Sequence, residues 1–242
     1  MHTQSQQKPG AVLSTARTEA FSDGVFAVAI TLLVLNLQVP QLASGGLLNN
    51  ELLHLLPKVL IYMLSFVVVG IYWVAHHNTF HYITHSDRTL LWLNILFLMC
   101  IVFIPFPTAL LGQYSDQRTS IIIYTGTLVI TGLVLQSLWW YVTNNYRLVD
   151  DEIDPQLVKK ATRRNLMAPL IYLLAIGISF LKIEVSLALL VLVPVLYIFP
   201  GRIDRHWTQR QRIDKTNVST NTDPALAQEE APSQRGVSAE QK

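Results

Sequence analysis

Long apolar runs separated by short polar segments fill the chain between residues 20 and 200. A helix needs roughly 17–25 mostly apolar residues to cross a bilayer. Six runs reach that length, at residues 20–39, 58–80, 89–111, 119–142, 166–182 and 184–200. Only Lys182 and Glu184 interrupt the last two, which form either a hairpin of two short helices or one unusual helix. The pattern predicts an all-α integral membrane protein with six or five transmembrane helices.

The distribution of positive charge decides between these two topologies. With six helices and a cytoplasmic N-terminus, fifteen of the 18 Lys and Arg residues lie on the cytoplasmic side. Only Lys58, Arg118 and Lys182 then lie outside. Five helices would move the cluster between Arg202 and Lys215 to the outside and remove most of this bias. Because short cytoplasmic segments are enriched in Lys and Arg, we expect six helices with both termini in the cytoplasm.

The apolar runs also divide the chain into three parts. Residues 1–19 are expected to form a cytoplasmic N-terminal segment, and residues 20–200 a single transmembrane domain. Residues 201–242 are polar and carry scattered charge, which is typical of a disordered tail. A cleaved signal peptide has an apolar core of only about 7–15 residues, so the longer first run favours a retained transmembrane helix.

Composition excludes several classes of function. The chain is 51% hydrophobic and 14% charged, and its net charge is +2. No basic stripe with interleaved aromatic residues is present, so no nucleic-acid partner is expected. The single cysteine excludes an intramolecular disulfide. His77, His81 and His85 have the spacing of helical metal ligands, but a histidine-rich membrane oxygenase needs several such groups. We expect neither an enzyme nor a metal site.

The first apolar run carries the chain's most informative polar residues. Arg17, Glu19, Ser22 and Asp23 stand at its start, and Thr31 stands near its centre. Ionisable groups in or near a bilayer are expensive, so they persist mostly for function or within a satisfied network. At 100° per residue one side of this helix is a narrow stripe, formed by Gly24, Val28, Thr31, Leu35 and Gln38. Such a stripe is compatible with helix packing or with a pore wall, and periodicity alone leaves both open.

Asp23 and Ser22 point away from this stripe, towards neighbouring helices. His77, at the end of the second run, and Asn94, near the start of the third, are expected at a similar depth. A carboxylate, an imidazole, an amide and a hydroxyl at one depth can satisfy one another. Two interpretations remain open, a structural brace between helices and a titrating proton relay.

Several motifs then point to one family. Arg17, Phe21, Ser22 and Asp23 form the pattern Arg-x-x-x-Phe-Ser-Asp at the start of the first run. Further similar segments are Tyr72-Trp73-x-x-His76-His77-x-x-Phe80, Leu91-Trp92-Leu93-Asn94 and Pro105-Phe106-Pro107-Thr108-Ala109-Leu110-Leu111. The chain resembles prokaryotic members of the transmembrane protein 175 family of potassium channels. The resemblance is close over about residues 17–112 and rests on hydropathy beyond them.

The resemblance implies a homotetramer of six-helix subunits around a central pore lined by the first helix. The family's constriction positions fall on Val28, Thr31 and Leu35, and its interhelical network on Ser22, Asp23, His77 and Asn94, with Arg17 at its edge or in the inner vestibule. Relatives often carry Leu or Ile where Val28 stands. The implied protein sits in the bacterial inner membrane, conducts K⁺ and other monovalent cations with modest selectivity, and uses no cofactor.

Two features of known potassium channels are missing from the sequence. Tyr124-Thr125-Gly126 lacks the rest of a Thr-Val-Gly-Tyr-Gly filter, so rings of carbonyls cannot replace the hydration shell of the ion. No apolar run carries Arg or Lys at every third position, so a voltage sensor is not expected. The alternative function is a proton-coupled secondary transporter with Asp23 and His77 as a relay, although no internal repeat supports it.

Overall fold

The computed structural model describes residues 15–41, 47–149 and 153–198, and the regular elements in these ranges are all helical. The elements are α1 (Thr15–Val34), α2 (Leu48–Phe80), α3 (Arg88–Phe103), α4 (Pro105–Gln113), α5 (Arg118–Thr143), the short 3₁₀ helix η1 (Asn144–Tyr146), α6 (Pro155–Ser179) and α7 (Ile183–Ile198). The described residues up to Leu196 belong to one compact unit, and of the second unit only residues 197 and 198 are described. The expected tail at 201–242 lies outside the described residues.

In the residues that the structure describes, six helical rods correspond to the six predicted runs, because α3 and α4 continue one another across Ile104. Ile104 keeps helical dihedral angles, and its amide donates to the carbonyl of Ile101 at 3.1 Å. Pro105 follows directly and has no amide hydrogen to continue the α-helical ladder. The break between α3 and α4 is therefore a proline interruption within one membrane-length rod.

Four helix boundaries differ from the predicted runs by five residues or more. α1 begins at Thr15, five residues before the predicted start at residue 20. α1 ends at Val34 rather than near residue 39, and its last turn tightens as Leu35 N bonds Leu32 O at 3.2 Å. α2 begins ten residues before the predicted start at residue 58 and contains Pro57. α6 begins at Pro155, where the Asp154 carboxylate caps it by accepting from Gln156 N at 2.8 Å. Polar helix ends escape a hydropathy criterion because they lie beyond the apolar run.

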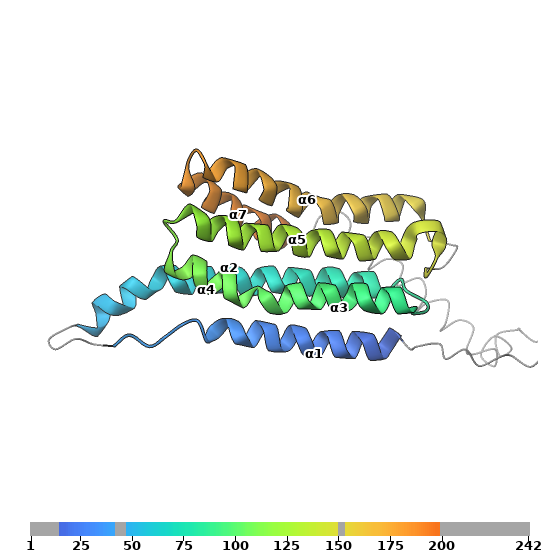
Figure 1. Cartoon of the computed structure of the whole chain (residues 1–242), viewed down its shortest axis with the longest axis horizontal. Helices are drawn as coiled ribbons and strands as arrows, with labels where there is room; N and C mark the ends of the chain where they lie inside the picture. The colour runs from blue at the N-terminus through green and yellow to red at the C-terminus, as the bar shows by residue number, and fades with distance from the viewer. Residues whose placement is uncertain (1–14, 42–46, 150–152, 199–242) are drawn as a thin grey trace, which may run out of the picture. The chain divides into compact units, whose positions relative to one another are not determined.

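The rods pack side by side, with α1 along one edge and α6 and α7 along the opposite one (Figure 1). α1 contacts α2, α3 and α4, while α6 contacts α5. The interior between them holds large apolar side chains such as Phe26, Phe97, Leu128 and Trp139. α1 therefore has one face on the bundle, and its other face is not covered by the helices of the described residues.

Hydroxyl groups tie the middle of the bundle together. Ser65 on α2 bonds both Tyr124 on α5 and Thr108 on α4, each at 3.0 Å. Tyr72, two turns further along α2, donates to the carbonyl of Leu128 at 2.7 Å. Since an unsatisfied buried polar group is destabilising, these bonds fix the register of α2 against α4 and α5.

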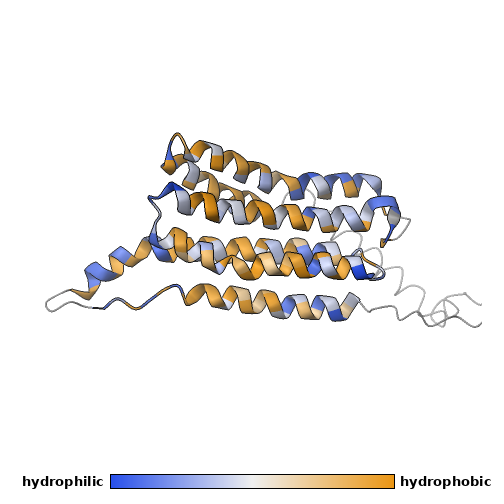
Figure 2. Ribbon diagram, in the orientation of Figure 1, coloured by the Kyte–Doolittle hydropathy of each residue, from blue (hydrophilic) through white to orange (hydrophobic). Residues whose placement is uncertain are grey.

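Among the described residues, three rods are long and apolar enough to cross a membrane, namely α2, α3 with α4, and α5. α7 is apolar but has only 16 residues. α1 carries Arg17, Glu19 and Asp23, and the first half of α6 is polar, as Figure 2 shows by the blue part of its ribbon. For α1, α6 and α7, length and composition alone do not show that the helix crosses the membrane, so their crossing stays a prediction.

A close contact between α5 and α6 gives a stability prediction. A methyl group at Gly132 would lie 2.7 Å from Cγ of Pro169, whereas one at Gly126 on the same helix would meet nothing within 4 Å. Gly132→Ala should destabilise the protein by about 1–3 kcal/mol, because overpacking forces the helices apart. Gly126→Ala is the matched control and should leave the unfolding temperature in detergent unchanged or raised. Equal unfolding temperatures for both variants would contradict the close approach.

Candidate functional site

The two faces of α1 have different environments. Ser22, Phe26, Ala29 and Leu33 are buried against the bundle. The opposite face is exposed and follows the line of the sequence stripe, with residues spaced alternately four and three apart along it: Arg17, Phe21, Gly24, Val28, Thr31 and Leu35. The exposed fraction is 55% for Val28 and 70% for Leu35. One face of α1 thus anchors the helix, and the other is free for a partner or a pore.

Thr31 bonds within its own helix. Its hydroxyl donates to the backbone carbonyl of Val28 at 2.8 Å, while the side chain stays exposed. A hydroxyl has one proton to donate and two lone pairs to accept with. With the proton directed into the helix, the oxygen presents its lone pairs to the exposed face. That orientation suits a cation or a water molecule on this side of α1.

Buried side chains behind the signature motif form a directed chain of hydrogen bonds. His76 Nε2 bonds Asn94 Oδ1 at 2.8 Å, and Asn94 Nδ2 donates to Ser22 Oγ at 3.0 Å. Ser22 then donates to the carbonyl of Thr18 at 2.8 Å. Because Oδ1 can only accept, the proton of His76 lies on Nε2. The chain connects α2, α3 and α1, and its three side chains are buried.

The imidazole in this chain belongs to His76, not to the expected His77. The ring of His76 packs against the rings of Phe26, Phe80 and Phe97, whose centroids lie 5.8, 4.4 and 5.5 Å away. A signal was present in the sequence, since Tyr72, His76 and Phe80 are spaced by four and share one face of α2. His77 falls on the next face, which is exposed. The helical phase therefore selects His76 for the interior.

Asp23 and His77 meet the same exposed residue instead of the buried chain. Asp23 Oδ1 accepts from the indole Nε1 of Trp73 at 2.8 Å, which joins α1 to α2. The ring of His77 stacks on that of Trp73 at a centroid distance of 5.8 Å. Trp73 was not among the expected site residues, although it stands in a motif that carried the family resemblance. Ser22 and Asn94 are brought together as expected, whereas Asp23 and His77 are not part of their chain.

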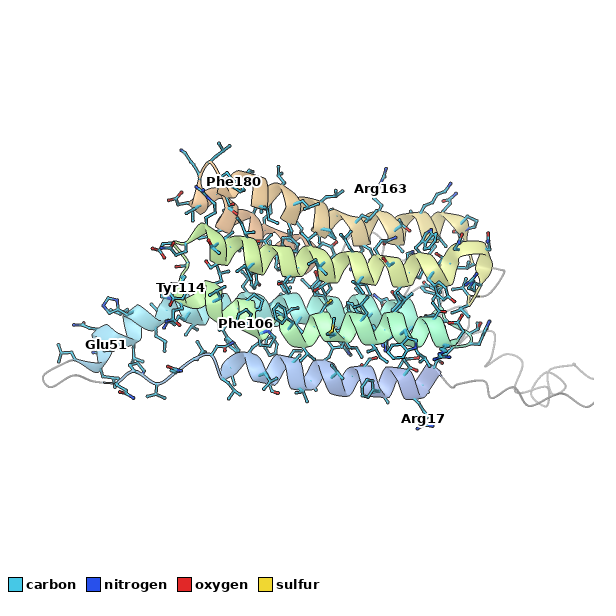
Figure 3. All side chains as sticks on the ribbon, viewed as in Figure 1. Arg17, Glu51, Phe106, Tyr114, Arg163 and Phe180 are labelled. Atoms are coloured by element: carbon cyan, nitrogen blue, oxygen red, sulfur yellow. The ribbon has the colours of Figure 1, made fainter. Side chains whose placement is uncertain are left out.

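Arg17 and Phe21, the other members of the signature, lie on the exposed face of α1. Figure 3 shows Arg17 pointing away from the bundle. At the other end of α1, Asn36 Nδ2 donates to the carbonyl of Pro105 at 3.0 Å, at the proline break between α3 and α4. The helix is thus pinned near both ends by polar bonds, with the stripe from Val28 to Leu35 near its second end.

No group of three or more His, Cys, Asp or Glu side chains suited to a metal ion occurs within residues 15–41, 47–149 and 153–198. In that part of the chain the ring of His85 contacts the neighbouring hydroxyl of Thr84 at 2.9 Å. The site around α1 combines hydroxyl, amide, aromatic and apolar groups with imidazoles, one carboxylate and one guanidinium, which belong to His76, His77, Asp23 and Arg17. Its chemistry suits binding or passage of a solute.

Comparison with known proteins gives a consistent result. Residues 17–105 match the sequence model of the family described as endosomal/lysosomal potassium channel TMEM175. A potassium channel from Streptomyces collinus is 39% identical over 178 residues, which cover 72% of this chain and 86% of the relative. An endosomal/lysosomal proton channel TMEM175 from Danio rerio is 24% identical over 186 residues, covering 74% of this chain and 36% of that protein.

A solved structure shares the fold. The crystal structure of a lysosomal potassium-selective channel TMEM175 homologue from Chamaesiphon minutus matches with a TM-score of 0.69 at 34% identity. The match covers 76% of this chain and 96% of that chain. Together with the apolar rods described above, these findings make the chain a multi-pass membrane protein. It belongs to the TMEM175 family of channels.

Proposed function

We propose that four copies of this chain form a K⁺-permeable cation channel whose central pore is lined by α1. The observation that carries the proposal is the exposed face of α1 and of the turn that follows it, which holds Val28, Thr31 and Leu35. Other sides of the helix are bonded to its neighbours, through Ser22 to α3 and through Asp23 to α2. A lining helix needs this division, because its pore face must stay free while its back is held in position. We assign K⁺ as the permeant ion because the relatives are named as potassium channels.

The permeation path follows from the side chains on this face. Rings of Val28 and Leu35 narrow and partly dry the passage, as apolar constrictions do. A ring of Thr31 oxygens between them lowers the barrier by offering lone pairs to a partly dehydrated cation. One hydroxyl ring provides few ligands, so the preference of K⁺ over Na⁺ is modest. Tyr124, Thr125 and Gly126 lie inside α5 and contribute no carbonyl filter.

The remaining properties complete this proposal. The bonds through Ser22, Asn94 and His76, together with the contact of Asp23 with Trp73, hold the pore helices in place. The chain lies in the bacterial inner membrane with both termini in the cytoplasm, following the distribution of Lys and Arg. Residues 1–19 and 201–242 flank the channel domain of residues 20–200. The channel has no voltage sensor and needs no cofactor beyond its permeant ions.

In the described part of the chain, no direct hydrogen bond joins the two relay groups of the alternative function, a proton-coupled transporter. Its two relay groups, Asp23 and His77, both touch the indole of Trp73. An indole Nε1–H donates a hydrogen bond but accepts none, so it cannot pass a proton between them. The buried chain from His76 ends at a backbone carbonyl, which is also no proton carrier. We therefore favour passive permeation.

Ion flux in reconstituted liposomes tests the proposed function. Purified wild-type protein under an outward K⁺ gradient should release K⁺ without valinomycin when a membrane-permeant anion leaves with it and balances the charge. At equal pH on both sides, no stoichiometric proton movement should accompany the release. Empty liposomes and liposomes carrying a heat-inactivated sample serve as controls. K⁺ movement that requires an imposed pH gradient, with protons moving in a fixed ratio to K⁺, would favour the coupled transporter. Flux of protons with no flux of K⁺ would contradict the assigned ion.

A further inference from the structure

A second feature of the molecule concerns α6, on the edge of the bundle away from α1. The first half of this helix is polar and the second half apolar, as the change of colour along its ribbon shows (Figure 2). Lys159, Lys160 and Arg163 are exposed in the first half. Figure 3 shows Arg163 pointing away from the neighbouring helices. These cations lie in a rigid helix, where their spacing is fixed.

The apolar half of the same helix continues this surface. Met167, Leu170 and Leu174 have exposed fractions of 40%, 62% and 57%. At 100° per residue they fall within the same arc of about 100° as the three exposed cations. The opposite face of α6 is occupied, since Tyr172 and Ala175 are buried. One continuous strip of α6 is thus basic at one end and apolar at the other.

The point where the strip on α6 changes from basic to apolar residues matches the boundary of a membrane. Trp139 Nε1 on α5 donates to Thr162 on α6 at 3.2 Å, so the tryptophan pair of α5 lies level with Arg163. Its neighbour Trp140 is 61% exposed. Exposed tryptophan is enriched where headgroups meet the hydrocarbon. From Arg163 to Leu174 the helix rises about 16 Å, close to the roughly 15 Å depth of one hydrocarbon leaflet.

We propose that this strip of α6 binds an anionic phospholipid. The phosphate headgroup lies against Lys159, Lys160 and Arg163, and an acyl chain lies along Met167, Leu170 and Leu174. Charge complementarity selects an anionic headgroup, and the length and polarity of the strip select a molecule with an apolar chain attached to it. The same cations face the leaflet that the topology proposed above assigns to the cytoplasm, but binding does not depend on the ion that the channel conducts.

Native mass spectrometry of the detergent-purified protein tests this assignment. Phosphatidylglycerol and phosphatidylcholine with identical acyl chains are titrated separately, and bound lipid is counted per protein. The wild type should bind phosphatidylglycerol more tightly. The triple variant Lys159→Gln/Lys160→Gln/Arg163→Gln should bind it about tenfold or more weakly, because each cation near an anionic headgroup contributes a several-fold gain. Binding of phosphatidylcholine should not change.

A second triple variant controls for net charge. Arg210→Gln/Arg212→Gln/Lys215→Gln removes the same charge from the C-terminal segment and should leave lipid binding as in the wild type. Equal weakening by both variants, or none by the α6 variant, overturns the proposal. A change of oligomeric mass without loss of lipid also overturns it, in favour of a second copy on this face. If the α6 variant does not fold, the wild type still decides, since its preference for phosphatidylglycerol must fall as salt is raised.

Discussion

Replacing Thr31 by valine should lower K⁺ flux about tenfold or more and remove the preference for K⁺ over Na⁺. Valine has nearly the shape of threonine, so the change removes the hydroxyl and keeps the width of the passage. Thr31 donates to Val28 O within its own helix, and its oxygen faces the exposed side of α1. Without that oxygen, a partly dehydrated cation loses its polar contact between two apolar rings. A loss of only about 1.4 kcal/mol is a tenfold change in rate.

Two further variants distinguish an effect on the pore from a general effect of losing a threonine hydroxyl in a helix. Thr31→Ser keeps the hydroxyl and should keep most of the flux. Thr143→Val removes a threonine that makes the same kind of bond, to Trp139 O at 2.8 Å on α5, and should leave flux unchanged. Liposome flux is measured for each variant at matched protein density. If Thr31→Val keeps the flux and selectivity of the wild type, Thr31 does not line the pore.

Hydropathy predicted most of the fold because a bilayer restricts what the backbone can do. Inside the hydrocarbon every amide and carbonyl must be bonded within the protein, so a long apolar run has to become a helix. The errors lie where this restriction ends. The start of α2 holds Asn49, Asn50, Glu51 and His54, which have the polarity of a loop, yet they continue the helix. Polarity identifies the end of an apolar run and not the end of a helix.

One site residue was predicted one position away from the residue that the structure shows. The sequence interpretation placed His77 near Asn94, whereas the structure places the adjacent His76 there. Neighbouring residues on a helix differ by about 100°, so only the phase of the buried face decides. That phase was available from Tyr72 and Phe80. The bond of Asp23 to Trp73 could not be predicted from polarity, because an indole counts as apolar in hydropathy and still has one proton to donate.

Replacing Asn94 by leucine should lower the unfolding temperature of the channel by about 3–10 °C. The change leaves the Nε2–H of His76 without its acceptor and removes the donor to Ser22, in a region where all three side chains are buried. An unsatisfied buried group costs about 1–3 kcal/mol, and each kcal/mol corresponds to about 2–4 °C for a domain of this size. Gln113→Leu, an amide exchanged at an exposed position of α4, should shift the unfolding temperature by less than about 2 °C.

Replacing all three hydrogen-bonded side chains by apolar ones separates the cost of unpaired polar groups from the loss of packing. The triple variant Ser22→Ala/His76→Phe/Asn94→Leu leaves no side-chain polar group of this hydrogen-bonded set unsatisfied. A phenyl ring takes the place of the imidazole among Phe26, Phe80 and Phe97. Removing every partner can be nearly neutral, so the triple variant should regain much of the stability that Asn94→Leu loses. Thermal unfolding in detergent measures all variants together. A triple variant less stable than Asn94→Leu would mean that shape, rather than hydrogen bonding, holds α1 to α2 and α3.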